Sequence, residues 1–298
     1  MSEHPNHRVH RKPKSRTFSR PGKVRAKRER EKVRDKGLWV YCVRRAAVHT
    51  PAESIPGIQP GTKVHTITLK DIEAVASVVD LQQFGARQLK EKLATDLSWT
   101  ERSVQRHHDI IVNAGGEGTV VPMKFGTIFA TRKNLEAMLK KYYRKFTTLL
   151  VQLKGREEWG VKVFLDKARF IELLKKNDPE IQQFEIRKGK TPEGMRWYVD
   201  RKIDEAVQKK FEKVVEDDLV KIIQGLEKYA EQVVINNPSP PELTGREMAL
   251  HTACLLKKEA RRPFQENVRK LFAGFKARGL SGEITGPWPL YNFVGIKK

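Results

Sequence analysis

The sequence predicts an α+β protein with mixed sheets. Short runs rich in β-branched and aromatic residues alternate with longer segments in which apolar residues recur every three or four positions. Several of the short runs come in close pairs, as hairpin strands do. With 298 residues the chain is long enough for two domains with their own cores. We expect an N-terminal α+β domain at residues 37–130, a connecting helix at 131–157 and a C-terminal domain at 158–298.

The first 36 residues differ from the rest of the chain in their charge. They contain fourteen Lys or Arg and four Asp or Glu, and so contribute +10 to a formal net charge of +23. Because they contain few apolar residues, they cannot bury enough surface to offset the chain entropy lost on folding. We therefore predict a disordered basic tail at residues 1–36.

A basic tail of this kind could bind an acidic partner. It could neutralise nucleic-acid phosphates without reading their sequence, or it could contact an acidic protein surface. The residues that carry this hypothesis are Arg11, Lys12, Lys14, Arg16, Arg25, Lys27 and Arg28.

The N-terminal domain should open with strands and continue with helices. Leu89, Leu93 and Leu97 recur every four residues and predict a helix. A second helix should open at Ser98, whose spacing to Glu101 is that of a capping box. The strand candidates before these helices are residues 38–43, 64–69 and 72–79.

A long helix is predicted after an extended stretch at residues 119–129. Thr131 can cap its first turn, and the apolar residues behind it repeat with alternating steps of four and three, which is a heptad seam. Because the seam is shorter than three heptads, we expect it to pack inside this chain. Its residues are Leu135, Leu139, Tyr142, Phe146, Leu149 and Leu153.

The second half of the chain also alternates strands with helices. A run of Asn and Asp before Pro179 should end one helix, and a run of Asn and Pro after Ile235 should end a longer one. The predicted elements are a strand at 159–165, a helix at 166–176, a polar loop at 188–194, a long helix at 201–233, a strand at 248–256 and a helix across 264–275.

Residues 286–293, here named the closing segment, end the fold with the sequence GPWPLYNF. Pro287 and Pro289 bracket Trp288 and exclude a helix. Trp288, Tyr291 and Phe293 need apolar surface. The segment either fills the core of the C-terminal domain as a last edge strand or offers its aromatic side chains to a hydrophobic partner, and both can hold together.

Three stretches resemble one known family. The closing segment is similar to the last motif of the gas vesicle GvpL/GvpF family. Residues 120–129 (VVPMKFGTIF) and 158–163 (EWGVKV) resemble two earlier blocks of that family, in the same order. The tail has no counterpart in that pattern, and Leu290 stands where a second proline often follows.

The resemblance implies a fold and a function. It implies a C-terminal domain with a ferredoxin-like sheet and long helices. It implies an accessory or minor structural protein that is needed to assemble gas vesicles, the gas-filled protein shells of prokaryotic cells. The implied partners are the small hydrophobic shell protein and other accessory vesicle proteins, and the implied place is the cytoplasm, next to gas vesicles.

An apolar edge could bind the shell protein. Residues 120–129 and the closing segment are both apolar and extended, so we assign partner binding to their large side chains. These are Val121, Phe125, Phe129, Trp288, Tyr291 and Phe293.

The sequence offers no constellation that indicates an enzyme, a cofactor or a metal. The glycines at residues 115–118 lack the Lys-Ser/Thr ending of a phosphate loop. His107 and His108 point about 100° apart on a helix and cannot share one ion. The acids at 216–218 are typical of a solvated helix face, and Cys42 and Cys254 of buried apolar positions in a reducing compartment.

Two other function classes stay open at this point. The tail could make the protein a nonspecific nucleic-acid binder, which deletion of residues 1–36 would test. An enzyme would need a site assembled from distant residues. No run of the sequence is apolar for long enough to predict a membrane span.

Overall fold

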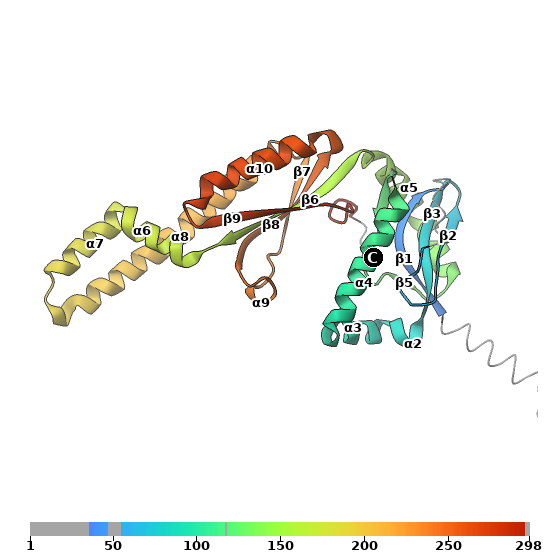
Figure 1. Ribbon diagram of the computed structural model, residues 1–298, viewed down its shortest axis with the longest axis horizontal. Coiled ribbons are helices and arrows are strands. Elements are labelled where there is room, and N and C mark those ends of the chain that lie inside the picture. The colour runs from blue at the N-terminus through green and yellow to red at the C-terminus, as the bar shows by residue number, and fades with distance from the viewer. Residues whose placement is uncertain (1–35, 47–54, 117, 296–298) are drawn as a thin grey trace, which may run out of the picture.

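Two antiparallel sheets organise the chain (Figure 1). The computed structural model describes residues 36–46, 55–116 and 118–295. The tail residues assigned to nucleic-acid or acidic-partner contact, from Arg11 to Arg28, lie outside this range, and only Lys36 of the predicted tail is described. Among the described residues we find no helix whose length and apolar character would let it span a bilayer.

The first sheet is built around β1 (Lys36–Arg45). Strand β3 (Ile72–Asp80) pairs with one edge of β1, and β2 (Val64–Leu69) pairs with β3. The other edge of β1 takes β4 (Val120–Pro122) and β5 (Ile128–Phe129). Every pair is antiparallel, so the prediction of mixed sheets was wrong. Lys70 and Asp71 are too short a connection between β2 and β3 for a parallel crossover.

Helices cover both faces of the first sheet (Figure 1). One face of β1 carries Trp39 and Tyr41, which pack with Ile110 and Ile111 of α4 (Leu97–Gly115). The other face packs on α5 (Arg132–Gln152). The small helices α2 (Leu81–Phe84) and α3 (Ala86–Thr95) lead from β3 into α4.

Helix α5 confirms the predicted cap and seam. The side chain of Thr131 accepts a hydrogen bond from the backbone N–H of Asn134 at 3.2 Å. Leu135, Leu139 and Phe146 are fully buried against the first sheet. The helix therefore buries its apolar face within this chain. It packs on the first sheet.

The start of α4 differs from the prediction. Asp96, not Ser98, is the N-cap, and its side chain accepts a hydrogen bond from the backbone N–H of Trp99 at 2.9 Å. Aspartate caps as well as serine does, and the chain turns at Asp96, so the leucine spacing crosses two helices. Leu89 is buried in α3 while Leu97 of α4 is exposed.

The second sheet has the order β7-β8-β6-β9. Its central strands are β6 (Arg156–Leu165) and β8 (Glu247–Lys257), and its edges are β7 (Gln232–Asn236) and β9 (Leu280–Trp288). Helices α8 (Arg196–Glu227) and α10 (Arg261–Lys276) pack on one face through Ile222, Phe264 and Val268, among others. The short helix α9 (Pro241–Thr244) joins β7 to β8.

Strand β7 was not predicted. The sequence prediction extended the long helix to Val233, but α8 ends at Glu227 and the chain turns at Tyr229 and Ala230. Residues Val233, Val234 and Ile235 are β-branched and pair with β8 instead. Val233 lies four residues after Tyr229, which fits a helix, so periodicity extended the predicted helix to Val233.

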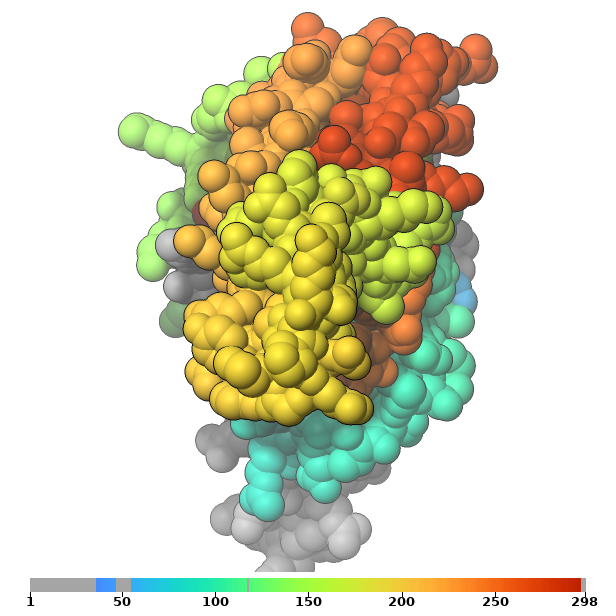
Figure 2. Space-filling view, turned by 90° about the vertical axis from the view of Figure 1, so that its left-hand side faces the viewer, coloured from blue at the N-terminus to red at the C-terminus, as the bar shows by residue number. Residues whose placement is uncertain are grey.

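An arm of helices projects from the second sheet, at the left of Figure 1 and toward the viewer in Figure 2. It consists of α6 (Lys167–Asn177), α7 (Pro179–Lys190) and the first half of α8. Ile181, Ile203 and Val207 form its small core. Helix α7 continues into the predicted polar loop, and α8 begins five residues before its predicted start, at Arg196.

Leu139→Ala should lower the free energy of unfolding by about 3 kcal/mol, because it leaves a cavity in the core under α5. Chemical denaturation monitored by far-UV circular dichroism measures this change. Lys140→Ala, one position away and exposed, should change it by less than about 0.5 kcal/mol. Equal effects of the two substitutions would contradict the packing of α5 on the first sheet.

Candidate partner-binding site at the closing segment

The closing segment lies at the junction of the two sheets. Leu290, and Val294 just after the segment, are buried in the same core as Leu135 of α5. Leu255 of β8, a strand of the second sheet, is buried in that core too. One short stretch of chain therefore packs against both sheets and joins them.

A buried carboxylate holds this segment. Glu158 Oε2 accepts a hydrogen bond from the backbone N–H of Asn292 at 2.9 Å, and Glu158 Oε1 accepts one from Asn292 Nδ2 at 2.6 Å. Burial raises the pKa of Glu158, and the two hydrogen bonds from Asn292 offset only part of that effect. Asn292 supplies the donors that a buried carboxylate needs.

Glu157, the residue before Glu158, is also buried, but its pKa is lowered rather than raised. Glu157 Oε2 accepts hydrogen bonds from Arg261 Nε at 2.9 Å and from Trp159 Nε1 at 3.1 Å. Burial alone would raise the pKa of Glu157, but the hydrogen bonds and charge of Arg261, with Trp159, lower it. Successive strand residues face opposite sides, so Glu157 fixes α10 while Glu158 fixes the closing segment.

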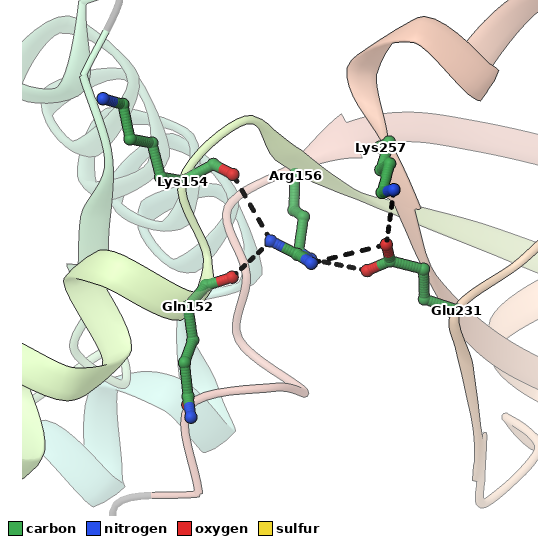
Figure 3. A network of polar contacts seen from close by, with 5 residues as sticks. All are labelled: Gln152, Lys154, Arg156, Glu231 and Lys257. Carbon is green, nitrogen blue, oxygen red and sulfur yellow. Dashed lines mark hydrogen bonds and ion pairs between the residues drawn. The ribbon is translucent and has the colours of Figure 1, made fainter.

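A polar network bridges the link between α5 and β6 (Figure 3). Arg156 Nη1 donates to the backbone oxygen of Gln152 at 2.5 Å, and Arg156 Nε donates to Glu231 Oε2 at 2.5 Å. Lys257 Nζ lies 3.9 Å from the same carboxylate. Arg156 thus connects the last turn of α5 to the second sheet.

Trp288 is the aromatic residue of the closing segment that is exposed to solvent. Its side chain is 42% exposed. Its ring lies 5.3 Å from the ring of His108 on α4, and its Nε1 donates to Thr285 Oγ1 at 3.0 Å. A hollow of about 180 Å³ beside it is lined by the end of α4, the α5–β6 link and residues 287–290.

The face of α4 that meets Trp288 carries three exposed apolar residues among polar ones such as Glu101. Leu97, Val104 and Val112 are exposed, and their spacing places them on the same side of the helix as His108. We name Leu97, Val104, Val112 and Trp288 the α4–Trp288 surface. Exposed apolar side chains gathered on one surface are typical of a contact site for another molecule.

The comparisons with known proteins identify the family. Residues 37–295 match the model of a protein family described as "Gas vesicle synthesis protein GvpL/GvpF". The chain belongs to the GvpL/GvpF family.

The chain is similar both to a gas vesicle protein L and to gas vesicle proteins of the F kind. Gas vesicle protein L of a Streptomyces species is 26% identical over 266 residues, which cover 88% of this chain and 94% of that protein. Gas vesicle protein F1 of Halobacterium salinarum is 24% identical over 245 residues, with coverages of 81% and 86%.

Solved GvpF structures have a similar fold. GvpF from an Anabaena species superposes with a TM-score of 0.63 at 16% identity, over 88% of this chain and 98% of that one. GvpF from Microcystis aeruginosa gives 0.61 at 17% identity, over 87% and 99%. The prediction of an α+β fold of the GvpL/GvpF kind is confirmed at this level.

The structure separates the six predicted partner-binding residues. Val121 is fully buried, and Phe129 and Phe293 pack partly buried on the core under α5. Phe125 and Tyr291 pack partly buried on the core around Trp39. Only Trp288 of the six is exposed, and binding by any of them stays a prediction.

The residues weighed for chemistry have structural partners. His107 Nδ1 accepts a hydrogen bond from Trp39 Nε1 at 3.0 Å, and burial lowers the pKa of His107 to about 4. Burial raises the pKa of the Cys42 and Cys254 thiols to about 12. Both thiols therefore stay protonated and uncharged, and they pack like small apolar side chains. No group of metal-ligating side chains is found among the described residues.

One acidic residue was misjudged. Glu216 and Asp217 are exposed, as predicted for a solvated face, but Asp218 is fully buried. Its Oδ1 accepts a hydrogen bond from Arg278 Nη1 at 2.5 Å, while its Oδ2 has no partner in the described chain. Arg278 lies 60 residues away in the sequence, so the charge pattern around Asp218 could not predict this pair.

Glu158→Gln should change how stability depends on pH. Because burial raises the pKa of Glu158 in the folded state, its contribution to stability is fully present below the unfolded pKa and is lost as pH rises through the folded pKa. Glutamine does not titrate. The melting temperature of the unsubstituted protein, minus that of the variant, should fall as the pH rises above the ordinary glutamate pKa of about 4.3. A difference that stays constant or grows would contradict this account.

Proposed function

We propose that this protein helps to assemble gas vesicles by holding the small hydrophobic shell protein on the α4–Trp288 surface. The observation that carries this proposal is the exposure of Trp288 beside exposed apolar residues of α4. The other aromatic residues of the closing segment are partly buried, so this is where the segment can meet a partner. Membership in the family described as "Gas vesicle synthesis protein GvpL/GvpF" supports a partner that is itself a gas vesicle protein.

A carrier role fits the physical needs of such a partner. A shell subunit with a strongly apolar face aggregates unless that face is covered before it enters the wall. An apolar patch on a charged protein can cover it reversibly, because the rest of the carrier remains well hydrated. This chain has 32% charged residues overall.

The remaining parts of the proposal follow from the same role. We place the protein in the cytoplasm next to gas vesicles, where it would also meet other accessory vesicle proteins. Its action needs no covalent step, so we assign it no catalytic residue. Nucleic-acid contact by the tail stays a prediction, because its residues lie outside the described part of the chain.

We also propose a division of the chain into two domains. Residues 37–130 would form the first domain, to which the helix within 131–157 adds its apolar face, and residues 158–298 would form the second. The second sheet has the order β9-β6-β8-β7, and its strands follow the sequence strand, helices, strand, strand, helix, strand apart from the short α9. That pattern is the basis for assigning a ferredoxin-like sheet.

The proposal can be tested by capturing the shell protein from cells that make both proteins. Trp288→Ala should reduce capture roughly tenfold, or about 1.4 kcal/mol, because it removes the exposed part of a large aromatic side chain. Trp197→Ala is the matched control, since Trp197 is 64% exposed and lies in the first turn of α8. It should leave capture within about twofold.

Three outcomes would contradict the proposal. Unchanged capture by a folded Trp288→Ala protein would remove the α4–Trp288 surface from the role. Normal buoyant vesicles in cells that lack the protein would remove the assembly role itself. Deleting residues 1–36 should leave capture intact, whereas loss of capture would transfer binding to the tail.

A further inference from the structure

A second open surface lies between β9 and α10. Strand β9 is an edge of the second sheet and pairs with β6 alone among the described strands. Helix α10 runs beside it (Figure 1). Between them is a hollow of about 460 Å³, lined among others by Phe272, Leu280 and Ile284. We name it the β9–α10 groove.

The floor of this groove depends on a glycine. The ring of Phe272 lies directly over Gly282, where a Cβ atom would come within 2.0 Å of the ring. Any larger residue at this position would push Phe272 away from the strand. The close approach of ring and backbone leaves an apolar floor beside the free edge of β9.

The rim of the groove is basic. Arg269 and Lys276 line it and are exposed, and neither forms an ion pair with the described residues. Helix α10 contains a single acid, Glu266, against five Lys or Arg. Of these five, Arg261 already pairs with Glu157. The groove therefore favours an anionic occupant.

We propose that the β9–α10 groove binds an acidic, extended segment of another protein by strand addition to β9. An edge strand offers free backbone N–H and C=O groups, which an extended peptide can pair with. Antiparallel addition continues the pattern of the sheet. Alternate side chains would then enter the hollow over Phe272, and acids would meet Arg269 and Lys276.

A peptide fits this groove better than a nucleic acid does. Single-stranded nucleic acid needs exposed aromatic rings on which its bases stack. Phe272, the aromatic ring that lines the groove, is buried. A strand edge, in contrast, supplies hydrogen bonds that only an extended backbone can match in register.

The test uses the full-length protein and a fluorescein-labelled heptapeptide in which valine alternates with aspartate. Fluorescence anisotropy should show binding that weakens with salt. Arg269→Gln combined with Lys276→Gln should weaken it at least about fivefold, from the loss of two charge contacts. Hydrogen exchange should slow at residues 280–284 when the peptide binds, because an added strand protects edge amides.

Matched controls separate this site from general attraction to cations. Lys213→Gln combined with Lys270→Gln removes two exposed cations outside the groove and should change affinity less than about twofold. A peptide with proline in place of valine should not bind, since it cannot pair as a strand. Equal binding of that peptide, or a single-stranded oligonucleotide that binds as tightly as the acidic peptide, would overturn the proposal. So would equal loss in both double variants or unchanged exchange in β9.

Discussion

The docking of the closing segment between the two sheets is the constraint on which the rest of the structure depends. Leu290 and Val294 complete a core that is otherwise made by α5 and the first sheet. The hydrogen bonds of Asn292 to Glu158 fix the segment to the first residues of β6. Gly286, with φ of +134°, lets the chain pass Trp159 and the backbone oxygen of Glu158, where a Cβ atom would be 3.0 Å from that oxygen.

This docking also decides which aromatic residues can act outside the fold. Tyr291 and Phe293 are drawn into the two cores of the first sheet, so they stabilise the junction. Trp288 lies three residues before Tyr291, at the end of β9, and its ring contacts His108 of α4. The α4–Trp288 surface carries exposed apolar side chains, whereas the rim of the β9–α10 groove is basic. The two surfaces therefore suit partners of different chemistry.

Local patterns in the sequence predicted the elements that depend on neighbouring residues. The strands β2 and β3, the Thr131 cap and the buried face of α5 were predicted because each follows from spacing within a few turns. Strand β7 was missed because the position of Val233 fits the periodicity of a helix as well as that of a strand. The junction could not be derived from spacing, since Glu158 and Asn292 are 134 residues apart. The signal that the sequence offers is the pair of glutamates, Glu157 and Glu158, near the start of β6.

The most direct measurement of the central claim is site-specific photocrosslinking in cells that form gas vesicles. A benzophenone amino acid replaces Trp288 in one protein and Phe293 in another, so that the same probe lies on the surface or in the junction. The account expects the small shell protein to crosslink from position 288 and not from position 293. Crosslinking from position 293 alone, or from neither position, would contradict it.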